Sequence, residues 1–445
     1  FFDTIYNAES LFGQLFVIAM IARRQTISFE SALNDPATDG QHCIDCNGKK
    51  ILKMACIYGA NASGKTNILE ALRFYAYFML SSFTRLKPDD AIDFTPFKFD
   101  PQLQNQPDAF EIILYLKNSN TEGYTRYEYN LKLTRTAVVY ESVYYAPKGQ
   151  KKLIVMRDEH TGIKWGSDIS GPKKAIENLV RPNCSLLSAS QQVQFSTLKR
   201  LALYLTVFFA GIVSMSNEFL RGNAFAKIKP WFPEFRDYLV QLLSASDMGT
   251  ISDIKVEHIP ITEDLAATLP QEMQERIVNY NGKLTVQDVQ VTHRYDNHDY
   301  VLSIDEESAG TIRMIELSAL LHSLKYENIA YIISIDELET SLHRELIETF
   351  LDLFLYVATE SQLIFTAHDQ DLLDSGLLRD DEVWFCYKTD KGNSVYNSIT
   401  DYTGIRKGVS RKKLYNADKF GALPLVNVNV LKELFYAEKN SENTK

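Results

Sequence analysis

Apolar residues along the chain follow the two spacings that distinguish strands from helices. Residues 51–58 (ILKMACIY), 330–337 (AYIISIDE) and 362–368 (QLIFTAH) are short, nearly continuous apolar runs, which is typical of strands buried on both faces. Residues 66–83 and 342–357 carry apolar residues at helical spacing, which predicts helices. Because strand, helix and strand follow one another, we expect a parallel sheet with helical crossovers.

The segment after the first helix has a different pattern. Residues 110–116, 127–133 and 138–145 are rich in β-branched and aromatic residues and are separated by turn clusters, which predicts an antiparallel meander. Residues 172–243 are mostly helical in pattern and include the apolar stretch 201–215 (LALYLTVFFAGIVSM). They show no sustained heptads, so we expect no long coiled-coil arm.

Strand patterns return between residues 250 and 304, and a further helix is expected from Ala309 to Leu324. The order of elements predicts an α/β fold with a mixed sheet core, an antiparallel β subdomain and an inserted helical subdomain. We expect four regions, namely an N-terminal lobe, a helical insertion, a C-terminal lobe and a final region of strands with a basic tail. These regions are residues 1–171, 172–249, 250–375 and 376–445.

The composition of the 445 residues is typical of a soluble globular protein, with 45% apolar and 23% charged residues. The net charge of −10 gives no support to a protein whose whole surface binds nucleic acid. The longest apolar run, residues 15–22, is shorter than the ~20 residues of a membrane-spanning helix, so we expect no membrane partner. Five cysteines, an odd and sparse set, argue against a secreted disulfide framework and favour a cytoplasmic location.

Residues 59–66 (GANASGKT) fit GxxxxGK[ST], the pattern of a phosphate-binding loop, and they lie between a predicted strand and a predicted helix. Glycines let backbone N–H groups close around phosphate oxygens, Lys65 neutralises their charge, and the Thr66 hydroxyl suits a Mg²⁺ ion. The expected nucleotide contacts are Gly59, Ala60, Asn61, Ala62, Ser63, Gly64, Lys65, Thr66 and Asn67. We call residues 59–66 the phosphate loop.

Acidic residues follow the predicted buried strand at 330–335. Asp336 is expected to hold Mg²⁺ and Glu337 to polarise an attacking water. His368 ends the next apolar strand and is expected to reach the γ-phosphate. These residues predict nucleotide hydrolysis at one edge of the sheet, with Mg²⁺ as a cofactor and with Lys65, Glu337 and His368 as the catalytic residues. They do not distinguish ATP from GTP, and ATP as the cofactor is what the family resemblance described below implies.

A helix start precedes the acidic strand. Ser308 is a suitable N-cap, and Gly310 exposes backbone N–H groups, so this helix end suits an anion. A simple helix cap explains the same residues, and only their position before the acidic strand favours a role in nucleotide binding.

The order GANASGKT, ESAGT, IISIDELETSLH and FTAHD resembles the ATP-binding-cassette (ABC) branch of the P-loop NTPases, in the group similar to SMC and to overcoming-lysogenisation-defect proteins. More narrowly, residues 25–425 resemble the "AAA family ATPases" of bacterial abortive-infection and phage-defence operons. The resemblance implies a P-loop NTPase of ABC-ATPase type that dimerises around ATP. The signature differs from that of transporters at Ala309 and Thr311.

The same resemblance assigns roles to individual residues. Ser308 and Gly310 correspond to the signature that contacts the partner subunit's nucleotide, and residues 339–343 to the dimer-facing loop. His368 corresponds to the switch histidine. Gln192 is the candidate glutamine that senses Mg²⁺ and water, and Gln191 fits nearly as well.

The implied function is an ATPase that forms a homodimer or higher oligomer and acts as a switch for an effector protein, a toxin or nuclease, in anti-phage defence. Two alternatives stay open: a DNA-clamping repair ATPase, for which nucleic acid would be a partner, and a nucleotide-binding scaffold with little turnover. A basic strip at residues 405–419 contains six lysines and arginines and suits an acidic partner or a phosphate backbone, although a solvated helix explains it equally well.

Two clusters of possible metal ligands do not predict a metal site. Cys43 and Cys46 form one CxxC without a second pair. The second cluster lies in a predicted hairpin without a nucleophile pattern. Its members are His293, Asp296, His298 and Asp299.

Overall fold

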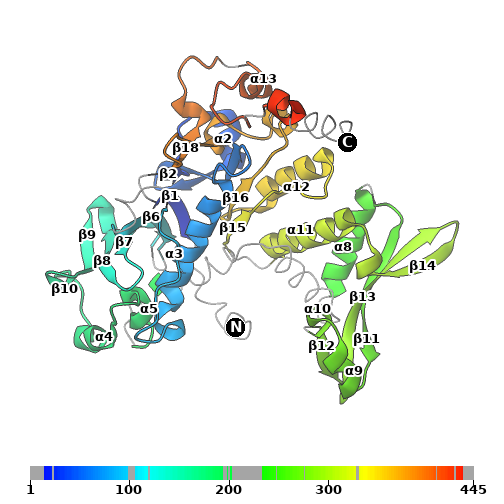
Figure 1. The fold of residues 1–445 in the computed structure, drawn as a ribbon, viewed down its shortest axis with the longest axis horizontal. Coiled ribbons are helices and arrows are strands. Elements are labelled where there is room, and N and C mark those ends of the chain that lie inside the picture. Colours follow the sequence, from blue (N-terminus) through cyan, green and yellow to red (C-terminus); the bar gives the residue numbers. More distant parts are fainter. Residues whose placement is uncertain are drawn as a thin grey trace, which may run out of the picture.

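The structure is a computed structural model (Figure 1). It describes residues 15–22, 25–98, 106–118, 121–193, 198, 201–202, 233–246, 248–274, 276–326, 330–406, 408–424 and 427–433. The apolar stretch 201–215 lies outside the described residues beyond Ala202, so the predicted helical insertion is only partly described.

A five-stranded sheet of order β15-β16-β5-β17-β18 contains the predicted parallel strands. The first four strands are parallel, and β18 pairs antiparallel with β17, so the expected crossover topology is confirmed. The strands are β5 (Met54–Gly59), β15 (Ile332–Ile335), β16 (Gln362–Thr366), β17 (Val383–Lys388) and β18 (Ser394–Ser398).

Alternate residues of β5 enter two different cores. Ile57 packs in the same core as helix α3 (Lys65–Arg85), and Tyr58 packs in a core with helices α11 (Ala309–Tyr326) and α12 (Arg344–Val357). Successive side chains of a strand point to opposite faces. Helices therefore cover both faces of the sheet, which is why the strand sequences are continuously apolar.

A seven-stranded sheet of order β10-β9-β8-β7-β6-β1-β2 contains the predicted meander. All its pairings are antiparallel, which confirms the expectation from residues 110–145. The strands are β1 (Leu15–Ala22), β2 (Gln25–Ser28), β6 (Asp108–Lys117), β7 (Tyr124–Leu133), β8 (Val138–Ala146), β9 (Lys152–Asp158) and β10 (Gly162–Trp165).

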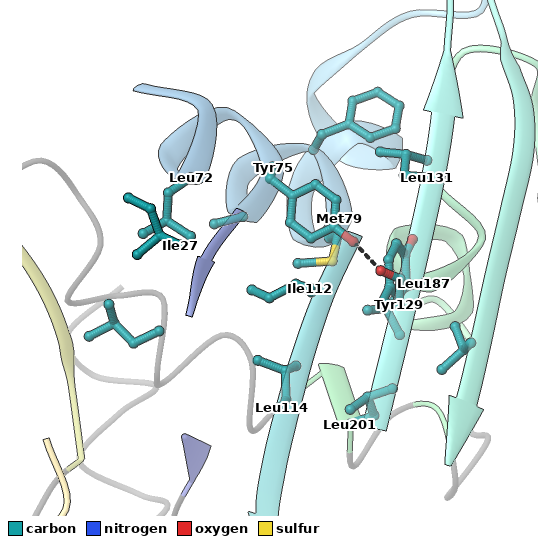
Figure 2. Close-up of a cluster of buried hydrophobic side chains, with 14 of the residues drawn as sticks. Ile27, Leu72, Tyr75, Met79, Ile112, Leu114, Tyr129, Leu131, Leu187 and Leu201 are labelled. Atoms are coloured by element: carbon teal, nitrogen blue, oxygen red, sulfur yellow. Dashed lines mark hydrogen bonds between the residues drawn. The ribbon is translucent and has the colours of Figure 1, made fainter. Parts of the chain in front are cut away.

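Helix α3 packs against both sheets. Figure 2 shows Tyr75 and Met79 of α3 facing strands β6 and β7. The Tyr75 hydroxyl donates to the Tyr129 carbonyl at 2.8 Å, and the two rings meet edge to face with centroids 5.8 Å apart. Because the same core contains Ile57 of β5, the meander holds α3 against the parallel sheet. The phosphate loop, which joins β5 to α3, is thus fixed at both ends.

The C-terminal end of α3 is covered by the segment that contains helix α5 (Leu186–Ser190). Arg181 Nη2 donates to the carbonyls of Phe83 and Leu86 at 2.6 and 2.8 Å, and Ser185 Oγ donates to the Met79 carbonyl at 2.8 Å. The last carbonyls of a helix have no partner within the helix. This segment supplies a partner to the Phe83 carbonyl and to that of Leu86, just beyond the helix.

A buried carboxylate attaches that segment to the meander. Glu141 on β8 accepts from Arg157 Nη2 at 2.8 Å and from the Leu186 N–H at 2.9 Å. The Tyr129 hydroxyl donates to the same carboxylate. Glu141 therefore provides a hydrogen-bond acceptor for two buried donors, the Arg157 guanidinium and the Leu186 N–H group.

A four-stranded antiparallel sheet, in which β13 pairs with β11, β12 and β14, forms a separate lobe on the right of Figure 1. Helix α11 connects this lobe to the parallel sheet. Its residue Ile315 packs in the core of the four-stranded sheet, whereas Leu321 packs in a core of the parallel sheet. The lobe contains α8 (Pro233–Ala245), β11 (Ile251–Pro260), α9 (Glu263–Thr268), α10 (Gln271–Gln274), β12 (Ile277–Tyr280), β13 (Lys283–Tyr295) and β14 (His298–Ser303).

Short elements complete the described fold, and none of the described helices is long and apolar enough to cross a membrane. Cys43 and Cys46 lie on the β3–β4 hairpin, where burial raises the pKa of the Cys43 thiol to about 11 and that of Cys46 to about 12. The short elements are α2 (Pro36–His42), β3 (Cys43–Cys46), β4 (Lys49–Leu52), α4 (Lys173–Leu179) and α13 (Arg411–Asn416).

The basic strip at residues 405–419 is partly neutralised within the chain. Arg411 Nε lies 2.8 Å from Asp380 Oδ1, and Arg411 Nη1 donates to the Leu378 carbonyl at 2.7 Å. Lys412 forms an ion pair with Asp371. Lys407 lies outside the described residues. Arg411 and Lys412 thus hold α13 against the preceding segment.

Replacing Glu141 with Ala is expected to destabilise the protein strongly, because Arg157 would keep a buried charge without its carboxylate. We expect the free energy of unfolding to fall by about 3 kcal/mol or more. Glu159→Ala, which removes an exposed carboxylate, is the matched control and should change little. Chemical denaturation measures both, and equal midpoints for the two variants would contradict this role of Glu141.

Candidate nucleotide-binding site

The phosphate loop has the backbone shape that its sequence predicts. It leaves β5 at Gly59 and enters α3 at Lys65, and Ala62 and Gly64 adopt left-handed φ values of 61° and 112°. Such residues turn consecutive N–H groups toward one point, which makes a concave site for an anion. The N-terminus of α3 adds its unpaired N–H groups and the positive end of its dipole.

Both glycines of the pattern are also required by close packing. A Cβ atom on Gly59 would lie 2.2 Å from the Cys386 carbonyl oxygen, and one on Gly64 would lie 2.2 Å from Ser394 Oγ. These contacts come from the β17–β18 hairpin, which lies beside the loop. Any larger residue at either position would displace the loop or the hairpin.

Lys65 lies across the phosphate loop. Its Nζ donates to the carbonyls of Gly59 and Ala60 at 2.9 and 3.2 Å. Burial lowers the pKa of Lys65, and nearby acidic groups, including Asp336 and Glu337, act in the opposite direction. The ammonium group is therefore within the loop, where phosphate oxygens would replace the two carbonyls as its partners.

The acidic strand end meets the phosphate loop directly. Thr66 Oγ1 donates to Asp336 Oδ2 at 2.8 Å, although 270 positions separate the two residues. Thr366 Oγ1, at the end of β16, donates to the other Asp336 oxygen and accepts from the Glu337 N–H at 2.8 Å. Sequence reasoning missed Thr366, although a polar residue at the end of the apolar run QLIFT was a usable signal.

Glu337 and His368 lie together at the same edge of the sheet. Glu337 has a left-handed φ of 49° and an exposed side chain, and its Oε1 lies 3.9 Å from His368 Nε2. Left-handed backbone is unfavourable for a residue other than glycine and occurs disproportionately at functional sites. The ends of strands β5, β15 and β16, which the sequence predicts to form the site, thus lie close together.

Glu339 is a further acidic residue that sequence reasoning did not place in the site. Its Oε1 accepts from the His368 N–H group. Its Oε2 and Ser63 Oγ are buried oxygens without a hydrogen-bond partner among the described residues. Unpaired buried oxygens beside a concave site are consistent with partners that a ligand or water would supply.

Ser308 and Gly310 begin α11. Ser308 is exposed, and its Oγ accepts from the Thr311 N–H at 3.0 Å, so it is the helix cap that its sequence suggests. A Cβ on Gly310 would lie 2.9 Å from the Ser341 carbonyl, so the helix start touches the loop that follows β15. A hydrogen bond between His293 Nε2 and Glu307 Oε1, 2.6 Å apart, anchors the residue before Ser308 to β13.

The prediction that Gln192 senses Mg²⁺ does not agree with the structure, and neither does the alternative, Gln191. Gln191 Nε2 donates to the Leu80 carbonyl at 2.7 Å, and Gln192 is exposed in the next position. At a rise of 1.5 Å per residue, Leu80 lies about 20 Å along α3 from Thr66. Both glutamines belong to the segment that covers the opposite end of α3.

Among the described residues, no three or more His, Cys, Asp or Glu side chains are grouped so that they could hold a metal ion. The predicted hairpin around His298 is confirmed by the pairing of β13 with β14. Two of its members form contacts with protein side chains. Asp299 Oδ1 lies 2.7 Å from Arg294 Nε, and His293 contacts Glu307.

Comparison with protein families matches residues 54–374 to the family described as "AAA domain, putative AbiEii toxin, Type IV TA system". The chain belongs to this family. The matched region runs from the start of β5 past His368, so it includes the phosphate loop, α11 and the acidic strand end. No curated protein matches the chain.

Among solved structures, SMC head domains are similar at low identity. One is described as the SmcHead bound to the C-winged helix domain of ScpA, with 13% identity over 88% of this chain and 100% of that chain and a TM-score of 0.35. Another is the SMC head domain from Thermotoga maritima, with 10% identity over 86% and 98% and a TM-score of 0.36. In this chain itself, a strand of a parallel sheet leads through the phosphate loop into a helix, which agrees with the predicted P-loop NTPase fold.

The Asp336 carboxylate is expected to make nucleotide affinity depend on Mg²⁺. Asp336→Asn removes the charge that attracts the ion while keeping the shape of the side chain. We expect the gain in ATP affinity on adding Mg²⁺ to fall by about tenfold or more. Calorimetric titrations with Mg²⁺ and with EDTA measure this gain, with Asp352→Asn on α12 as the control. An unchanged gain would contradict the role of Asp336.

Proposed function

We propose that this AAA-family protein is an ATPase that binds Mg–ATP at the phosphate loop and hydrolyses it at the edge of the parallel sheet. The observation that carries the proposal is the 2.8 Å hydrogen bond between Thr66 Oγ1 and Asp336 Oδ2. It joins the hydroxyl expected next to a magnesium ion to the carboxylate expected to bind the same ion.

The residues present fit Mg²⁺. Thr66 Oγ1 and Asp336 Oδ2 are hard oxygen ligands, and their separation of 2.8 Å is close to the distance of about 2.9 Å between adjacent ligands of an octahedral Mg²⁺ ion. When bound, Mg²⁺ would neutralise charge on the phosphate oxygens. Thr366 orients Asp336 by donating to its second oxygen.

Hydrolysis transfers the γ-phosphoryl group to water. The water oxygen attacks the γ-phosphorus, the bond to the bridging oxygen breaks, and ADP leaves. Glu337, exposed at the strand end, accepts the proton from the water, and Lys65 stabilises charge on the phosphates. His368 Nε2 lies 3.9 Å from Glu337 Oε1, and the role that we propose for it is to contact the γ-phosphate or the attacking water.

We further propose that two copies of the chain enclose ATP, with Ser308 and Gly310 of each copy contacting the nucleotide of the other. Two observations support this arrangement: Ser308 is exposed at a helix start, and that start lies against the Ser341 carbonyl in the loop after Glu337. A helix N-terminus presents N–H groups to an anion. A second copy is therefore a chemically suitable source of the remaining phosphate contacts.

The biological role that we propose is a nucleotide-dependent switch for an effector protein, such as a toxin or nuclease, in bacterial anti-phage defence. The family description, which names a putative AbiEii toxin and a Type IV TA system, supports a link between this family and a toxin. Co-purification of the effector encoded beside this protein, with and without ATP, tests it. An effector whose association and activity are both independent of ATP would contradict the switch.

Replacing Glu337 with Gln is expected to reduce turnover by about 10²-fold or more, because the amide keeps the shape of the side chain but accepts no proton. ATP affinity should stay close to that of the wild type, since Lys65 and the loop N–H groups are unchanged. Phosphate release and ATP titration measure the two quantities, with Glu345→Gln on α12 as the control. Normal steady-state phosphate release from Glu337→Gln would show that another group activates water.

Mixing two inactive variants tests the composite sites. Lys65→Ala inactivates the phosphate loop, and Ser308→Arg blocks the helix start, so each homodimer lacks activity. In a mixed dimer, the intact loop of one chain faces the intact helix start of the other, and one active site returns. We expect ATPase activity to recover on mixing. No recovery at any ratio, with subunit exchange verified by labelled chains, would mean that Ser308 does not act on a partner's nucleotide.

A further inference from the structure

The β17–β18 hairpin lies directly beside the phosphate loop. Strand β17 pairs in parallel with β5, so that Cys386 is level with Gly59. Strand β18 returns antiparallel, which places Tyr396 opposite Cys386. The hairpin therefore brings residues more than 300 positions away in the sequence against the loop that begins at Gly59.

Three side chains of this hairpin donate hydrogen bonds to carbonyls of the phosphate loop. Ser394 Oγ donates to the Ser63 carbonyl at 2.6 Å, and Cys386 Sγ contacts the same carbonyl at 3.3 Å. The Tyr396 hydroxyl donates to the Gly64 carbonyl at 2.6 Å. Burial raises the pKa of Tyr396, so its hydroxyl remains a donor at physiological pH.

The direction of these carbonyls determines the direction of the neighbouring N–H groups. In a trans peptide unit, the carbonyl of one residue and the N–H of the next point in opposite directions. A carbonyl of Ser63 held toward the hairpin turns the Gly64 N–H away from it. The Gly64 carbonyl, held in the same way, turns away the Lys65 N–H. These two N–H groups are among the phosphate donors of a GxxxxGK[ST] loop.

We propose that Ser394 and Tyr396 are positioning residues for the nucleotide phosphates, because they hold the loop carbonyls outward and thereby orient the Gly64 and Lys65 N–H groups toward the bound anion. The inference rests on the proposed nucleotide binding and assigns the β17–β18 hairpin to the same site. We call this pair of hydroxyls the hairpin latch.

The missing Cβ of Gly64 supports the latch independently. The space beside Gly64 is filled by Ser394 Oγ, which would lie 2.2 Å from a Cβ, and the Tyr396 hydroxyl oxygen would lie 3.4 Å from it. Gly64 also has a left-handed φ of 112°, a backbone conformation that glycine adopts without a steric penalty. Gly64 and the hydroxyls of Ser394 and Tyr396 are thus in close contact, and the phosphate loop packs tightly against the hairpin.

Two conservative variants remove the donors and leave the packing. Tyr396→Phe keeps a buried ring, and Ser394→Ala keeps the Cβ. We expect each variant to weaken the binding of ATP by about three- to tenfold, the range for loss of one hydrogen bond, and the double variant to lose more. Turnover at saturating ATP should stay within about twofold, because Glu337 and His368 are untouched.

The matched control is Tyr387→Phe. Tyr387 lies on β17 of the same hairpin, and its hydroxyl accepts from Asn397 Nδ2 at 3.4 Å rather than contacting the phosphate loop. This variant makes the same chemical change and should bind ATP as the wild type does. The melting temperature without nucleotide reports whether any variant acts through general stability.

Inorganic tripolyphosphate, which lacks the base and the ribose, is the decisive second probe in competition titrations. The latch acts on the phosphates. The affinity of the two variants for tripolyphosphate should therefore fall by the same factor as their affinity for ATP. Wild-type affinity for ATP in both variants, or a loss for ATP but not for tripolyphosphate, would overturn the latch. A lower melting temperature with unchanged ATP affinity would do the same. Failure of the wild-type protein to bind either probe would instead contradict the proposed function.

Discussion

The hydrogen bond between Thr66 and Asp336 is the contact on which the candidate site depends. It joins the first turn of α3 to the end of β15, and so it links two parts of the chain separated by 270 residues. Parallel strands end at one edge of a sheet, and ligands of open α/β sheets bind at that edge. The order β15-β16-β5 places β16 between the two strands that carry Asp336 and the phosphate loop. Thr366 of β16 therefore reaches Asp336 as well.

This arrangement requires a rigid sheet, and the packing provides one. Helix α3 is held between the parallel sheet and the meander, while α11 is held between the parallel sheet and the β11–β14 lobe. The unfavourable backbone of Ala62 and Glu337 persists where the surrounding structure fixes it. The rigid parts thus support two short loops whose shape is set for an anion.

The sequence predicted the features that depend on neighbouring residues. The phosphate loop, the helix starting at Lys65 and the apolar strands each depend on a short stretch of chain, and all were found. Strands of one sheet also brought Asp336, Glu337 and His368 together as expected, because the ends of parallel strands meet at one edge. Long-range partners were not predictable in this way: Arg411 is paired with Asp380, and Gln191 binds the Leu80 carbonyl at the opposite end of α3. The Ser394 and Tyr396 contacts are of the same kind, since nothing near them in the sequence indicates a phosphate loop.

The Thr66–Asp336 pair marks the proposed metal–nucleotide site. Anomalous scattering from crystals grown with Mn²⁺ and a non-hydrolysable ATP analogue tests it most directly, because Mn²⁺ accepts the same oxygen ligands as Mg²⁺. We predict one strong peak within direct or water-mediated ligand distance of Thr66 Oγ1 and Asp336, with the triphosphate in the phosphate loop. A nucleotide bound elsewhere, or a peak remote from Asp336 with the loop empty, would contradict the account.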